Sequence, residues 1–83
     1  MPDHKFSLIV MSPDQILLSH NNVSAINIRL EDGRLLGIRP GHAPLIANTA
    51  AGNISYTIDS QVFEMPIPAG ILTVRKNVVK ILT

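Results

Sequence analysis

The chain has 83 residues, a length that predicts a single domain, and 46% of them are hydrophobic. Seven basic and six acidic side chains leave a net charge of +1, which is too balanced for electrostatic attraction alone to hold a nucleic acid or an anionic membrane. The absence of cysteine excludes disulfides, thiol nucleophiles and cysteine-based zinc sites.

Only three residues are aromatic, so the core must consist mainly of Ile, Leu and Val, and β-branched residues favour sheet. A core of this size supplies little net stability, and a partner surface would add to it. The segment Met1–Lys5 is not followed by a long apolar run, so we expect neither a signal peptide nor a membrane anchor.

Two short strands are predicted at the start of the chain. Phe6–Met11 is apolar with one polar interruption, and Ser12-Pro13-Asp14 then marks a turn. Gln15–Ser19 predicts a second strand, which His20-Asn21-Asn22 would close.

The segment Val23–Leu30 has the clearest alternation in the chain and predicts a strand with one buried face. The buried face would comprise Ile26, Ile28 and Leu30, and the wet face Ala25, Asn27 and Arg29. Glu31-Asp32-Gly33 then forms a charged turn, and Arg34–Ile38 is predicted to return as the hairpin partner.

Closely spaced prolines and glycines exclude a helix in the middle of the chain. Pro40-Gly41 predicts a type II turn, because proline fixes the first central dihedral and glycine accepts the positive φ that follows. Ala43–Asn48 is predicted to be a strand, since Pro44 and Gly52 bound it too tightly for a helix.

A hairpin is predicted from Gly52–Ile58 and Gln61–Pro66, joined by Asp59-Ser60. Pro66 and Pro68 should limit pairing at its end to a sheet edge or a bend.

A last hairpin joins Ile71–Arg75 to Val78–Leu82 across Lys76-Asn77. No segment has a sustained helical period. Eight or nine short strands predict an all-β domain of two antiparallel sheets, packed as a sandwich or flattened barrel.

No motif for catalysis, metal binding or cofactor binding is found. His4, His20 and His42 lack the spacing of metal ligands, and Ser19 and His20 would point to opposite faces of a strand. The imidazole of His42 could instead hydrogen-bond loop carbonyls and hold the turn. Glu31 and Asp32 are the only adjacent carboxylates, and a solvated loop or an interface contact explains them. These features indicate a binding module.

The segment Gly37–Leu45 resembles the Leu-Gly-Ile-x-Pro-Gly-His-Ala-Pro-Leu signature of the epsilon subunit of bacterial F-type ATP synthases. The same family includes the chloroplast epsilon and the mitochondrial delta subunits. Phe6–Gln15, Val23–Leu30 and Ala69–Val74 resemble further strands of this family in the same order. The resemblance covers nearly the whole chain.

The resemblance implies a ten-stranded β-sandwich and a non-catalytic rotor subunit without a cofactor. It would bind the gamma subunit with one sheet face, rest on the polar loops of the c-ring and couple proton-driven rotation to ATP synthesis. Its location would be the cytoplasmic face of the bacterial inner membrane, or the stromal or matrix side in an organelle. The family usually continues into two C-terminal helices, and this sequence predicts no such helical domain.

Site residues also follow from the resemblance. The gamma contacts correspond to Ser12, His42 and Ala47, and Pro40 and Gly41 correspond to a structural turn. The c-ring contact loop corresponds to Glu31, Asp32, Gly33 and Arg34. The family loop is usually acidic where Arg34 stands, so the ring would need a complementary charge.

Two alternatives remain open from the sequence. A biotinyl- or lipoyl-like carrier domain is also small and all-β, and it requires an exposed lysine at a hairpin tip, which Lys76 is near. The usual Met-Lys-Met or Asp-Lys-Ala context is missing. The other alternative is a generic β-barrel that binds a small ligand.

Overall fold

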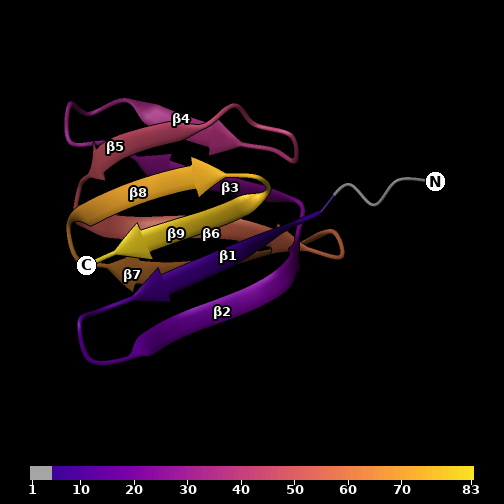
Figure 1. The fold of residues 1–83 in the computed structure, drawn as a ribbon, viewed down its shortest axis with the longest axis horizontal. Helices are drawn as coiled ribbons and strands as arrows, with labels where there is room; N and C mark the ends of the chain where they lie inside the picture. Colours follow the sequence, from indigo (N-terminus) through magenta and orange to yellow (C-terminus); the bar gives the residue numbers. More distant parts are fainter. Residues whose placement is uncertain (1–4) are drawn as a thin grey trace.

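The computed structural model describes residues 5–83, which form nine strands in two layers (Figure 1). His4 and most of the N-terminal segment lie outside the described residues. The strands are β1 (Phe6–Met11), β2 (Ile16–Val23), β3 (Ala25–Arg29), β4 (Leu35–Ile38), β5 (Leu45–Thr49), β6 (Gly52–Ile58), β7 (Gln61–Ile67), β8 (Gly70–Arg75) and β9 (Val78–Leu82).

The predicted β-sandwich is confirmed. One sheet has five strands in the order β2-β1-β9-β8-β5, and the other has four in the order β4-β3-β6-β7. Neighbouring strands run antiparallel, as predicted, except that β1 and β9 run parallel. This pair joins the first strand to the last, so no short connection had to link them. Among residues 5–83, no helix is long and apolar enough to cross a membrane.

All three predicted hairpins are present. The turns of β6–β7 and β8–β9 each have two central residues with positive φ, namely 51° and 66° at Asp59 and Ser60, and 50° and 60° at Lys76 and Asn77. Such turns match the right-handed twist of the strands that they join. β7 lies at the edge of its sheet, as predicted. Pro66 has no backbone N–H to donate, and at an edge this interrupts no pairing between central strands.

The turn predicted at His20-Asn21-Asn22 is wrong, because β2 continues through these residues to Val23. Phe6 pairs with Val23 and Leu8 with His20, so two steps along β1 face three along β2. A β-bulge accommodates the extra residue and keeps the strand paired. The His20 ring, 5.5 Å from the Tyr56 ring by centroids, also connects β2 to the opposite sheet.

The strand predicted over Val23–Leu30 is divided at Ser24, where the chain crosses from one sheet to the other. The backbone amide and the hydroxyl of Ser24 both donate to the carbonyl oxygen of Thr57, at 2.9 and 3.3 Å. The next residue, Ala25, was predicted on the wet face but is only 8% exposed. The crossing explains this difference, because Ala25 lies directly beside it.

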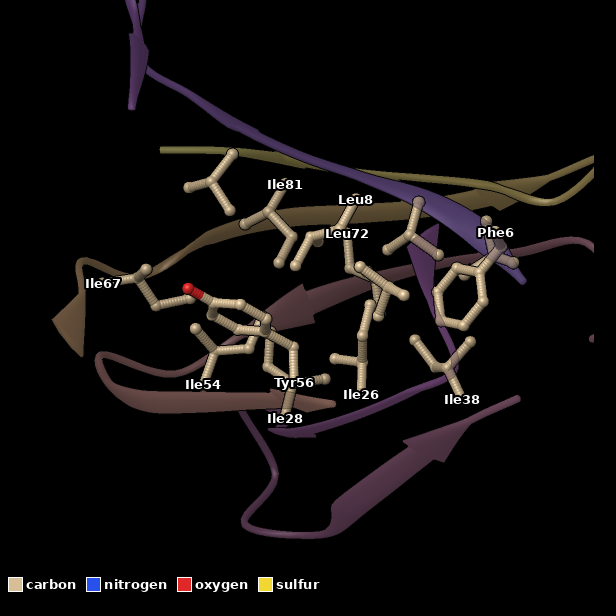
Figure 2. Close-up of a cluster of buried hydrophobic side chains, with 14 of the residues drawn as sticks. Phe6, Leu8, Ile26, Ile28, Ile38, Ile54, Tyr56, Ile67, Leu72 and Ile81 are labelled. Carbon is tan, nitrogen blue, oxygen red and sulfur yellow. The ribbon is translucent and has the colours of Figure 1, made fainter. Parts of the chain in front are cut away.

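The core lies between the two sheets and consists mainly of Ile, Leu and Val, as the composition predicts (Figure 2). The buried face predicted for Val23–Leu30 is confirmed, since Ile26 and Ile28 in β3 and Leu30 just after it are all buried. The largest side chains without exposure above 1% are Leu8, Ile26, Ile28, Ile38, Ile54, Leu72 and Ile81. Core side chains therefore occupy the inner faces, and the outer faces and loops are the surfaces that a partner can reach.

Candidate functional site

The predicted type II turn is present at the β4–β5 connection. Gly41 has φ of 81°, and the amide of His42 donates to the carbonyl oxygen of Arg39 at 3.2 Å. The amide of Gly41 donates to Oδ1 of Asn77 at 2.8 Å, which ties this turn to the β8–β9 turn. The predicted carbonyl contact of His42 is also found, with Nδ1 2.7 Å from the carbonyl oxygen of Ala43.

The charged loop between β3 and β4 is ordered by its own hydrogen bonds. Oδ1 of Asp32 accepts from the amide of Arg34 at 3.0 Å, and Oδ2 accepts from Nε of Arg34 at 2.8 Å. The amide of Arg34, helped by its guanidinium, holds the pKa of Asp32 below its ordinary value. The two charges are thus paired within the loop, although both side chains are exposed.

Two further contacts fix this loop to the sandwich. The amide of Glu31 donates to the carbonyl oxygen of Asn48 in β5 at 3.0 Å. Gly33 adopts φ of 91°, and its carbonyl oxygen accepts from Nη1 of Arg29 at 2.6 Å. The carboxylate of Glu31 projects from a defined position, and within residues 5–83 no ion pair involves it.

The three residues assigned to gamma contact do not form one patch. Ser12 follows β1 beside the end of β9, where the amide of Thr83 donates to the carbonyl oxygen of Met11. His42 lies near the start of β9, next to the turn that contains Asn77. These two residues are therefore at opposite ends of the five-stranded sheet. Ala47 is half-buried in β5 and packs against the core.

The outer face of the five-stranded sheet carries an apolar row that the sequence prediction missed. Met11 is paired with Ile16 on one side and with Leu82 on the other, and Leu82 is paired with Ile71. Ile16, Leu82 and Ile71 are 60%, 44% and 44% exposed, and Ile46 on β5 reaches 77%. The row of Ile16, Met11, Leu82 and Ile71 thus crosses four strands. Ile46 lies outside the row, because it pairs with Thr73.

The available signal was the presence of apolar residues at outward-facing positions of three predicted strands. Ile9 and Met11 alternate with buried residues of β1, and Ile71 and Leu82 do the same in β8 and β9. We expected each strand to have only one apolar face. Strands that are apolar on both faces are typically covered on both faces.

The outer face of the four-stranded sheet is different. Its centre is polar, with side chains from Asn27, Arg29, Asn53, Ser55, Thr57 and Glu64. Leu35 and Val62 are exposed, but they lie on the two edge strands and are separated by β3 and β6. The two outer faces therefore offer different surfaces to a partner.

The described residues contain no group of three His, Cys, Asp or Glu that could hold a metal ion. Ser19 is exposed, whereas the adjacent His20 is half-buried against Tyr56, so they do point to opposite faces. Lys76 occupies a hairpin turn with φ of 50°.

Comparison with known proteins gives a consistent family. Residues 5–83 match the model of the ATP synthase delta/epsilon chain β-sandwich domain. The ATP synthase epsilon chain of Lawsonia intracellularis is 36% identical over 98% of this chain and 59% of its own length. That of Leptospira borgpetersenii is 31% identical over 96% of this chain and 61% of its own length. The chain thus spans about three fifths of these curated relatives.

Solved structures agree. A chain of the Euglena gracilis mitochondrial ATP synthase superposes with a TM-score of 0.85 at 26% identity, covering 100% of this chain and 52% of that one. A chain from the central stalk and c-ring of the Tetrahymena thermophila enzyme gives 0.76 at 16% identity, over 99% and 65%, which shows the fold alone. From the family model and both epsilon-chain relatives, we conclude that this chain belongs to the ATP synthase delta/epsilon family and has the fold of its β-sandwich domain.

Proposed function

We propose that this domain is a non-catalytic part of the rotor of an F-type ATP synthase. It binds the gamma subunit with one sheet face and the c-ring with the loop Glu31–Arg34, so that rotation of the ring is transmitted to gamma without slippage. It acts on the cytoplasmic face of the bacterial inner membrane, or on the stromal or matrix side in an organelle. The family match favours this function over the carrier-domain alternative.

The observation that carries the proposal is the apolar row across the outer face of the five-stranded sheet. The row of Ile16, Met11, Leu82 and Ile71 lies outside a core that is already complete. Burying it would add stability to a domain of only 83 residues. Permanent interfaces are on average more apolar than transient ones, so this row suits a permanent rotor contact.

The charged loop has the properties of a second contact. It lies at the same end of the sandwich as Ser12 and Thr83, away from the Pro40-Gly41 turn (Figure 1). The hydrogen bonds of Asp32 fix its shape before binding, which lowers the entropy lost on docking. Glu31 has no ion-pair partner among the residues that the structure describes, so it can pair with a cationic group on the ring.

Site-specific cross-linking tests the c-ring part of the proposal. A photoreactive residue at Glu31, in the assembled ATP synthase, should cross-link to the c subunit. The same residue at Asn53, exposed on the outer face of the four-stranded sheet, serves as the matched control. Equal capture of the c subunit from both positions, or capture from neither, would contradict the assigned loop contact.

A further inference from the structure

The five-stranded sheet contains no acidic residue in any of its strands. Its outer face nevertheless carries two cations, Arg75 on β8 and Lys80 on β9, and Lys76 lies in the turn between them. All three are exposed. An apolar surface with charges of one sign at one end indicates a partner with complementary charge.

We propose that the outer face of this sheet binds a partner surface that is apolar at one end and bears carboxylates at the other. The proposal rests on the function inferred above, in which gamma is that partner. It adds that gamma must present acidic side chains opposite Arg75 and Lys80. These charges fix the direction in which the two surfaces align.

The register of the β8–β9 hairpin gives the geometry. Beginning at the turn, the outward pairs are Arg75 with Val78, then Thr73 with Lys80, then Ile71 with Leu82. Successive outward pairs are about 7 Å apart along the strands. The surface therefore changes from basic to apolar within about 14 Å, from the Lys76 end toward the C-terminal end of β9.

Among residues 5–83, no ion pair neutralises the cations of this face. Within the described part of the chain, the two ion pairs are Lys5 with Asp59 and Arg34 with Asp32, and neither involves the sheet. The neighbouring strands present Ser7, Ile9 and Ile46 outward, none of which is ionisable. The cations are therefore available to pair with carboxylates of a partner.

The cations border a shallow groove of about 560 Å³. Residues of the groove include Pro44, Ile46, Thr73, Arg75, Val78 and Lys80. An apolar side chain of the partner can enter the groove while a neighbouring carboxylate reaches Arg75 or Lys80. Partial desolvation would make such charge pairs stronger than exposed ones.

A second copy of this domain does not satisfy the same face. In either orientation of two facing copies of this sheet, the cations would meet uncharged side chains or other cations, since its strands contain no carboxylate. Burying unpaired charge is costly. The same face of a second copy is therefore a poor occupant, and an acidic surface is the one that this face fits.

Calorimetric titration with the gamma subunit of the same organism tests the proposal. The variant Arg75→Gln, Lys80→Gln lowers the net charge by two, and the control Asn27→Asp, Asn53→Asp on the other sheet also lowers it by two. At low salt we expect the Arg75→Gln, Lys80→Gln variant to bind gamma about tenfold more weakly or worse. The control variant should change the affinity by less than about twofold. Raising the salt from about 0.05 M to about 0.5 M should weaken wild-type binding markedly but the neutralised variant only slightly.

The outcomes distinguish an error in the acidic partner surface from an error in the rotor function. If the wild type binds gamma and the neutralised variant binds equally well, the acidic partner surface is wrong and the rotor function stands. If both pairs weaken binding equally, net charge matters and the location on this face does not, which also overturns the inference. If the folded wild type does not bind gamma, the proposed gamma contact and the acidic surface fail together.

Discussion

Replacing Gly70 by alanine should destabilise the fold sharply, for a reason that lies outside its own conformation. The φ of Gly70 is not in the left-handed region. A Cβ placed there would lie 2.1 Å from the carbonyl oxygen of Leu82 and 3.1 Å from Cα of Thr83. Both contacts are to backbone, so no side-chain rotation can relieve them.

The clash forces the start of β8 away from the end of β9. Overpacking of this kind costs about 1–3 kcal/mol. The displacement also breaks the 3.2 Å hydrogen bond from the Gly70 amide to Oγ1 of Thr49. The Thr49 hydroxyl then loses this bond while it is buried, since Thr49 is only 1% exposed. Losing it adds about 1 kcal/mol, for a total of about 2–4 kcal/mol.

Urea unfolding followed by circular dichroism measures this loss of the free energy of unfolding. The matched control is Gly37→Ala, since Gly37 is also a strand glycine but its Cβ would meet only the side-chain Oδ1 of Asn27, at 3.3 Å. That exposed amide can rotate away, so we expect a change below about 1 kcal/mol. A Gly70→Ala protein as stable as the Gly37→Ala protein would refute the reasoning.

Three smaller predictions concern turns. Gly41→Ala should cost about 1–2 kcal/mol in thermal unfolding, because φ of 81° is unfavourable for alanine although the space is open, and an unchanged melting temperature would argue against the turn. Ser60→Gly should instead stabilise the domain by about 1 kcal/mol by relieving φ of 66° in the same assay, and a lower stability would contradict this. Because the pKa of Asp32 is lowered, its ionised form stabilises the loop at neutral pH, and this contribution is lost as the pH falls below 3.8. The amide resonance of Arg34 should follow this titration by NMR in the wild type and not in Asp32→Asn, whereas an identical titration in the variant would exclude the hydrogen bond.

The sequence was a good guide to strands and to local turn chemistry. Alternation placed Ile26, Ile28 and Leu30 on the buried face, and the Pro-Gly pair predicted a type II turn that the dihedral of Gly41 confirms. These features depend on neighbours in the chain, which a sequence shows directly. The segment Ala69–Val74 resembles a family strand that contains glycine. In this fold Gly70 leaves no room for a Cβ beside the carbonyl oxygen of Leu82.

Features that depend on distant parts of the chain were harder to predict. The continuation of β2 through Asn21 and Asn22 requires β1 as a partner, and local composition favours a turn there. The parallel pairing of β1 with β9 has no local signal. The apolar row is formed by four strands in register. A single strand shows its own outward apolar residue but not that these residues lie side by side. The gamma contacts assigned to Ser12, His42 and Ala47 remain predictions. The three residues do not form one patch, but a large interface could still reach all of them.

The most direct test of the rotor function is calorimetric titration of the gamma subunit with two matched variants of this domain. Ile46→Glu, Ile71→Glu changes two exposed apolar residues on the outer face of the five-stranded sheet, 77% and 44% exposed. Leu35→Glu, Val62→Glu makes the same chemical change on the other sheet, at 61% and 68% exposure. We predict that the first variant, still folded, loses gamma binding and that the second binds like the wild type. Equal binding by both, or loss of binding only in the second, would contradict the assignment of the gamma contact to the apolar face.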